Sequence, residues 1–305
     1  MKHLLIIMLA LTLLVGFTGC GSDTEKTAVN TTGPLTDEEF RSAFDNNQLE
    51  KIHFLTDAQA KQLADFHGNY LNLTNLEQLT PAQAEAISVF RGKGLDLSGL
   101  KELPTEIAYE ISKSRAHRIY LKGLTSIAVE AAAALSDFEG YEIFLDNVTE
   151  IDLPITEALA KFAGQSIYLN GITAITDECA QAFADYQVDY LTLDGLTSLT
   201  DQQALALGSF GGQGLSLNGL TEVSELQMRA LMEFRGNEIF LNGIRLISDD
   251  QAEVIGRFGG QQVYLTGLKS LTENQAKYLA QFQGDIFMDD LDHNSANLFA
   301  KYKIE

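Results

Sequence analysis

The residues of this chain that could perform catalysis or bind a metal ion are few and scattered. The histidines lie in the first residues, the middle and the end, at His3, His53, His67, His117 and His293. The densest group of metal-ligand side chains lies near the C-terminus, at Asp289, Asp290, Asp292 and His293. Asp292 or Asn294 could instead cap a final helix. No nucleophile elbow, phosphate loop or HExxH motif occurs. We therefore predict no catalytic or metal-binding residues and no cofactor.

A second set of residues could bind a ligand without transforming it. A triplet of the type L-x-L recurs every 24 residues, and its middle position reads Asn72, Asp96, Tyr120, Phe144, Tyr168, Thr192, Ser216, Phe240, Tyr264 and Met288. Large rigid rings supply contact area at low entropic cost. We predict that the ligand-binding residues are Tyr120, Phe144, Tyr168, Phe240 and Tyr264, with Tyr190 on a flanking column. The alternative is that these rings only stabilise a sheet by stacking across strands.

A row of carboxylates and amides follows the aromatic column two residues later, at Asp146, Asn170, Asp194, Asn218 and Asn242. Such side chains could donate and accept hydrogen bonds with sugar hydroxyls, or hold a weakly bound calcium ion. Short polar residues are also typical of the position before a tight turn. We favour this structural interpretation.

These columns belong to a repeat, and its clearest marker is a phenylalanine every 24 residues. The series is Phe66, Phe90, Phe138, Phe162, Phe210, Phe234, Phe258 and Phe282, with Ser114 and Tyr186 filling its two gaps. A glycine follows two residues after each phenylalanine, as at Gly212. A period this regular indicates one supersecondary unit stacked about ten times. We expect these phenylalanines to pack between the units.

Each unit predicts a short strand, a turn and a helix. The alternation in L-x-L places the leucines in the core and the middle residue on the solvent face of a strand. Only Gly or Asn occurs two residues beyond the strand, as at Gly195, which predicts a backbone with positive φ. Gly212 and its equivalents predict left-handed helix ends. Helix N-caps are expected at Thr56, Thr80, Asp152, Thr176, Thr200, Ser224, Ser248 and Thr272.

Residues 35–305 resemble the leucine-rich-repeat superfamily in its helix-bearing bacterial type. The resemblance lies in the L-x-L strand, the stretch L-T-D-x-x-A-x-x-L-A and the 24-residue period. The resemblance implies an α/β fold, a right-handed leucine-rich-repeat-like solenoid of about ten strand-turn-helix repeats with a parallel sheet on the concave face. One feature departs from that superfamily. Its buried Asn or Cys after the strand is replaced by apolar residues such as Leu196 and Leu220. The loop backbone must therefore find other hydrogen bonds.

The first residues resemble the signal sequence of a bacterial lipoprotein. An apolar run from Leu4 to Phe17 follows Lys2 and leads into Phe17-Thr18-Gly19-Cys20. This resemblance to a lipobox implies that Cys20 is lipidated and becomes the mature N-terminus. An ordinary secretory signal is the alternative. We predict a signal peptide over 1–20, a flexible tether over 21–34 and one solenoid with terminal caps over 35–305. The other cysteine, Cys179, is expected in the core.

The formal net charge of −21 argues against binding to nucleic acid. We predict a lipid-anchored, non-enzymatic leucine-rich-repeat protein that binds a protein or polysaccharide through its concave sheet. The alternative is a structural or self-associating spacer. The expected location is the bacterial cell envelope, with the folded part in the periplasm or at the cell surface. In a cell with two membranes, Gly21 favours the outer membrane by analogy.

Overall fold

The computed structural model describes residues 33–303, so the predicted signal peptide, Cys20 and most of the predicted tether lie outside the described residues. One parallel sheet runs through this part of the chain, and its ten strands lie side by side in chain order. The strands are β1 (Tyr70–Asn72), β2 (Gly94–Asp96), β3 (Arg118–Tyr120), β4 (Glu142–Phe144), β5 (Ser166–Tyr168), β6 (Tyr190–Thr192), β7 (Gly214–Ser216), β8 (Glu238–Phe240), β9 (Gln262–Tyr264) and β10 (Asp285–Phe287).

One helix follows each strand. After the N-terminal cap, formed by α1 (Asp37–Asp45), the 3₁₀-helix η1 (Leu49–Lys51) and α2 (Asp57–Leu63), the helices are α3 (Pro81–Ser88), α4 (Thr105–Ser112), α5 (Val129–Ser136), α6 (Leu153–Leu159), α7 (Asp177–Ala184), α8 (Asp201–Gly208), α9 (Glu225–Leu231), α10 (Asp249–Gly256), α11 (Glu273–Ala280) and α12 (His293–Lys303). Among the described residues, no helix is both long and apolar enough to span a bilayer.

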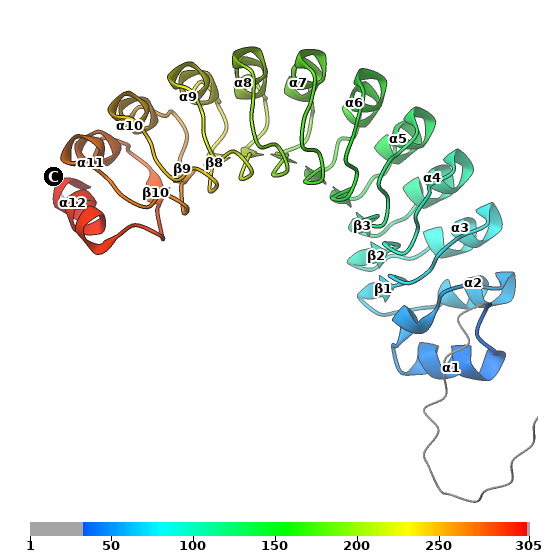
Figure 1. Cartoon of the computed structure of the whole chain (residues 1–305). Helices are drawn as coiled ribbons and strands as arrows, with labels where there is room; N and C mark the ends of the chain where they lie inside the picture. Colours follow the sequence, from blue (N-terminus) through cyan, green and yellow to red (C-terminus); the bar gives the residue numbers. More distant parts are fainter. Residues whose placement is uncertain (1–32, 304–305) are drawn as a thin grey trace, which may run out of the picture. The chain divides into compact units, whose positions relative to one another are not determined.

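The strands form the inner, concave side of the repeat stack, and the helices form its outer side (Figure 1). This arrangement has a simple physical cause. Neighbouring strands lie about 4.8 Å apart, whereas packed helices need about 8–10 Å between their axes. A stack of units with a strand on one side and a helix on the other must therefore bend toward its strands. The predicted α/β solenoid with a parallel concave sheet is confirmed.

The register of the sheet corrects one member of the predicted aromatic column. Neighbouring strands pair residues 24 apart, such as Phe144 with Tyr168. The last pair differs, because Phe287 pairs with Tyr264 and the step is one residue shorter. The column therefore ends at Phe287, and the prediction of Met288 in this position was wrong. The missing residue shifts the alternation of the final strand by one.

The predicted N-caps are confirmed in all eight helices, where the side-chain oxygen accepts a hydrogen bond from a backbone N–H in the first turn. The remaining repeats start differently. Helices α4 and α5 follow Pro104 and Ala128, which offer no side-chain cap. The predicted core is also confirmed, since Cys179 and Phe162 are completely buried.

The predictions of positive φ at the repeated glycines were wrong. Within residues 33–303, no glycine has a positive φ, and the one residue that has a positive φ is Asn47. The repeat needs glycine for close contact instead. A Cβ on Gly212 would lie 2.6 Å from the carbonyl oxygen of Val188, and one on Gly195 would lie 2.5 Å from that of Ile172. Both distances are too short for any side chain, so these glycines let successive repeats approach one another.

Glutamines supply hydrogen bonds between neighbouring repeats. In five repeats, the third residue of the helix is a glutamine whose Nε2 donates to a backbone carbonyl oxygen 28 residues earlier, at 2.7–2.9 Å. These glutamines are Gln83, Gln203, Gln227, Gln251 and Gln275. The same side chain completes a capping box at its own helix start, as in Gln203 with Thr200. Among the described residues, no buried side-chain nitrogen or oxygen lacks a hydrogen-bond partner.

Candidate functional site

The aromatic residues predicted to bind a ligand lie on the concave sheet, where they form two stacks. In the first stack, the ring centroids of Tyr120 and Phe144 are 4.4 Å apart and those of Phe144 and Tyr168 are 4.1 Å apart. The second stack contains Phe240 and Tyr264, 4.2 Å apart, and continues to Phe287 at 4.4 Å. Interplanar angles of 7–16° show that the rings stand face to face.

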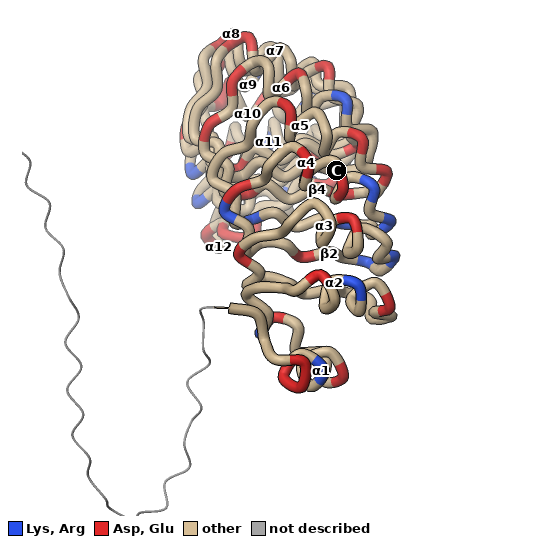
Figure 2. Tube along the Cα trace, turned by 90° about the vertical axis from the view of Figure 1, so that its right-hand side faces the viewer, with Lys and Arg blue, Asp and Glu red and all other residues tan. Residues whose placement is uncertain are grey.

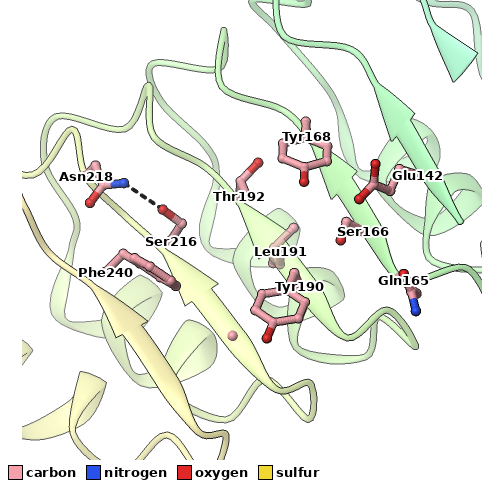
Figure 3. Close-up of a pocket in the computed structure, with 11 residues that line it drawn as sticks. Glu142, Gln165, Ser166, Tyr168, Tyr190, Leu191, Thr192, Ser216, Asn218 and Phe240 are labelled. Carbon is pink, nitrogen blue, oxygen red and sulfur yellow. Dashed lines mark hydrogen bonds between the residues drawn. The ribbon is translucent and has the colours of Figure 1, made fainter. Parts of the chain in front are cut away.

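This stacking limits which ring surfaces a ligand can reach. A ring inside a stack, such as Phe144 or Tyr264, has a neighbour against each face and presents its edge. A ring at the end of a stack has one face without an aromatic neighbour. Tyr168 ends the first stack and Phe240 begins the second, so these two rings turn their second faces toward the strands between them (Figure 3).

A hollow of about 410 Å³ separates the two stacks on the concave face. The aromatic column is interrupted there by Thr192 on β6 and Ser216 on β7, so two successive rings are missing. Figure 3 shows Tyr168 and Phe240 on opposite sides of the hollow, with Thr192 and Ser216 between them. The structure thus brings three of the six predicted ligand-binding residues, Tyr168, Tyr190 and Phe240, around one space.

Tyr190 contributes to the hollow from the first position of β6. Its ring lies against the Cα of Gly214 on the next strand, where any added Cβ would collide with the ring. Burial, and then the carboxylates of Glu238 and Asp189, raises the pKa of the Tyr190 hydroxyl above its ordinary value. The Tyr190 phenol is therefore neutral at physiological pH and lies near two carboxylates.

The first stack carries its own charged groups. Arg118 on β3 forms an ion pair with Glu142 on β4, and the Lys122 Nζ lies 3.1 Å from the Asp146 carboxylate. The Lys122 ammonium also lies 5.1 Å from the centre of the Phe144 ring. Burial, followed by Glu142, raises the pKa of the Tyr168 hydroxyl. These pairs neutralise the carboxylates at the N-terminal side of the hollow.

The polar row from Asp146 to Asn242 has a structural role, but it links neighbouring repeats, which the prediction of a turn position did not include. Backbone N–H groups of residues 194, 218, 242 and 266 each donate to the side-chain oxygen of the row member 24 residues earlier, at 3.0–3.1 Å. Asn170 completes the start of this ladder by donating to Asp146 Oδ1 at 2.8 Å. Most of these oxygens are therefore already engaged within the protein.

The C-terminal acidic cluster is also explained by contacts within the protein. Asp290 pairs with Lys269 and lies 3.9 Å from the Arg245 guanidinium. Asp292 caps α12, because the Ser295 N–H donates to its Oδ1 at 2.8 Å. In residues 33–303, no group of three or more His, Cys, Asp and Glu side chains is arranged to hold a metal ion.

The sequence reasoning missed several residues around the hollow. Ser216, Asn218 and Glu142 line it, and Phe287 extends the second stack. The signal for Phe287 was the shortened last repeat. The signal for the hollow was the pair of small polar residues, Thr192 and Ser216, between the two aromatic parts of the column. The space itself becomes visible only once the strands are packed side by side.

This geometry defines a class of fold: an α/β solenoid with leucine-rich-repeat architecture, one short parallel strand and one helix per repeat. No protein-family model matches the sequence, and no curated protein matches it. Among solved structures, the chain is similar to an internalin from Listeria monocytogenes, with a TM-score of 0.46, 17% identity, and coverage of 75% of this chain and 63% of the internalin. It is also similar to a chain in the Toll–Spatzle complex of Drosophila, with a TM-score of 0.46, 11% identity, and coverage of 70% of this chain and 29% of the other. The chain thus spans less than two thirds of either protein.

Proposed function

We propose that this protein is a non-enzymatic binding protein that recognises a protein ligand through its concave sheet, at the hollow between Tyr168 and Phe240. The observation that carries the proposal is the hollow between Tyr168 and Phe240, whose rings both line it and have no aromatic neighbour stacked on the side that faces it. Aromatic surface exposed in a depression and surrounded by polar groups is typical of the energetic centre of an interface.

Sheet stabilisation explains the stacks but does not explain their interruption. Aromatic residues at positions 192 and 216 would extend the stacking without a break, and cross-strand pairs contribute up to about 1 kcal/mol each. Small polar residues there give up that stabilisation and leave a space open. A role as a structural or self-associating spacer, the second candidate, gives no reason for this space.

The experiment compares what the purified protein and its variants capture from envelope extract of the source cells. In the concave variant, Tyr168→Leu and Phe240→Leu are combined to remove both ring faces while keeping apolar volume. The matched control combines Leu205→Ser and Leu226→Ser on the helical side, where both leucines are more than 60% exposed. We expect the concave variant alone to lose a specific protein partner. Equal capture by wild type and concave variant would contradict the proposal, and self-capture lost in the helical variant would favour the spacer.

We further propose that the protein is anchored to a bacterial membrane by lipid on Cys20, with the repeats in the periplasm or at the cell surface. Support comes from the apolar run before Phe17-Thr18-Gly19-Cys20. Several acyl chains give stable membrane attachment where one chain gives weak binding. Replacing Cys20 by Ala should move the protein from the detergent phase to the aqueous phase on detergent partitioning. A Cys20→Ala protein that stays in the detergent phase would contradict the lipid anchor.

A further inference from the structure

The hollow lies in the most acidic stretch of the chain. Between Lys122 and Arg229 the sequence contains sixteen Asp and Glu residues and a single basic residue, Lys161. Lys161 follows α6 and so belongs to the helical side of its repeat. Figure 2 shows acidic residues recurring from repeat to repeat along the stack. Opposite charge on a ligand would be attracted to this region and guided toward it.

One carboxylate lines the hollow and two others contact residues that line it. Glu142 lines its N-terminal side, where Arg118 pairs with it from β3. Asp194 lies behind two lining residues, accepting hydrogen bonds from Ser216 Oγ at 2.6 Å and from Asn218 Nδ2 at 3.1 Å. Those neutral donors orient the Asp194 carboxylate but leave its charge in place. Arg118 already neutralises Glu142, so Asp194 and Glu238, which lies beside Tyr190, are the carboxylates that favour a cation at the C-terminal part of the hollow.

The width of the hollow indicates the shape of the group that fits. Tyr168 and Phe240 stand three strands apart, which corresponds to about 14 Å at the usual strand spacing. The rings within each stack are 4.1–4.4 Å apart. The interruption is therefore two ring positions wide. A ligand that contributes a planar group against each wall would continue both stacks.

We propose that this hollow receives arginine side chains from an extended, basic segment of a partner protein, with guanidinium groups stacked on the open faces of Tyr168 and Phe240. A guanidinium is planar, stacks on aromatic rings and pairs with carboxylates, which matches both features of the site. A neutral aromatic side chain would match the rings but leave the carboxylates uncompensated. A lysine would match the charge but lacks the planar surface. The inference rests on the proposed function and specifies its partner chemistry.

The test is a calorimetric titration of the purified protein with the peptide acetyl-Gly-Arg-Gly-Arg-Gly-amide. Three matched peptides replace both arginines by lysine, glutamine or phenylalanine, and cellohexaose serves as a saccharide probe. We expect the arginine peptide to bind about tenfold more tightly than the glutamine and phenylalanine peptides, and more tightly than the lysine peptide. The affinity should fall as salt is raised, because the attraction is electrostatic.

Two variants connect this binding to the hollow. Phe240→Leu should weaken binding of the arginine peptide about tenfold, whereas Phe287→Leu, at the far end of the same stack, should leave the affinity unchanged. Circular dichroism checks that both variants are folded. Equal affinity for the arginine and glutamine peptides, tighter binding of the phenylalanine peptide or cellohexaose, or an unaffected Phe240→Leu variant would overturn the inference. If a protein partner is still captured through Tyr168 and Phe240 in that case, the proposed function stands and only the arginine assignment fails.

Discussion

Two aromatic columns run through this protein with the same 24-residue period, and they differ in what surrounds them. The phenylalanines of the first column from Phe90 to Phe282 are buried between repeats, with neighbouring centroids 6.0–6.5 Å apart. The rings of the second column stand half-exposed on the concave sheet at 4.1–4.4 Å. The wider spacing excludes close stacking, and the shorter one permits it. One 24-residue period thus places one aromatic column in the core and another on the surface.

The interruptions of the two columns reinforce this difference. Where the buried column lacks phenylalanine, Ser114 and Tyr186 are still buried, and the Tyr186 hydroxyl donates to the Thr156 carbonyl oxygen at 3.0 Å. The protein thus fills or closes its gaps in the core. On the concave sheet, the gap at Thr192 and Ser216 stays open as a hollow. Packing therefore governs the first column, and we infer that binding governs the second.

The largest effect should come from truncating equivalent rings in the two columns. Phe210→Ala removes a ring that is 1% exposed and should lower the free energy of unfolding by about 3–5 kcal/mol. Phe144→Ala removes a half-exposed ring and should cost about 1–2 kcal/mol, since it loses stacking but little burial. Urea unfolding of both variants measures the difference. Similar losses would contradict the assignment of core and surface.

A second comparison separates close packing from backbone conformation at adjacent glycines. Gly212→Ala should destabilise the protein by about 1–3 kcal/mol, because its Cβ would meet the Val188 carbonyl oxygen and the Phe210 ring. A Cβ on Gly211 would meet nothing within 4 Å. Gly211→Ala should therefore stabilise the protein by about 0.4–1 kcal/mol, because alanine lowers the conformational entropy of the unfolded chain. Thermal unfolding distinguishes them. A stabilising Gly212→Ala would show that its contacts are not needed.

The glutamines that donate hydrogen bonds between repeats should contribute to stability, whereas exposed glutamines on the same helices should not. Gln203→Ala removes the donor to the Ile175 carbonyl oxygen at 2.9 Å and one half of a capping box, and should cost about 1–3 kcal/mol. The neighbouring Gln202 is exposed, so Gln202→Ala should change stability by less than about 0.5 kcal/mol. Chemical denaturation of the pair is the measurement. Equal effects would mean that the inter-repeat hydrogen bond adds little.

The smallest predicted stability effect concerns the gap in the concave column. Thr192→Phe places a ring on β6, next to Tyr168 on β5. The new pair should raise the free energy of unfolding by up to about 1 kcal/mol. Differential scanning calorimetry measures this as a higher melting temperature. A destabilised Thr192→Phe would indicate that the gap exists because a ring does not fit.

Much of the fold was predictable because repetition averages out local ambiguity. Nine copies of L-x-L and eight capping residues, such as Thr200, identify strands and helix starts more firmly than one copy would. The glycines were predicted in the right positions for the wrong reason. Glycine is selected both for positive φ and for close approach, and a sequence alone does not separate the two. At Gly195 and Gly212 the close approach comes from the neighbouring repeat, which only the assembled stack reveals.

The candidate site was predicted in part. The aromatic column of Tyr120, Phe144, Tyr168, Phe240 and Tyr264 lies on the strands of the concave sheet as expected, and its rings stack across neighbouring strands. Which ring faces remain open depends on stacking between strands, and that depends on exact register. Because the last repeat is one residue shorter, Phe287 and not Met288 lies in the aromatic column, opposite Tyr264. The same dependence explains why the hollow beside Ser216 was not recognised from the column.

The most direct test of this account is the affinity of the Thr192→Phe variant for the arginine peptide, measured beside wild type by calorimetry. The variant fills one of the two missing ring positions and covers the open face of Tyr168. If the gap is a binding site, the variant should be at least as stable as wild type and bind the peptide about tenfold more weakly. A stable Thr192→Phe protein that binds the arginine peptide as tightly as wild type would show that the gap is not the binding site.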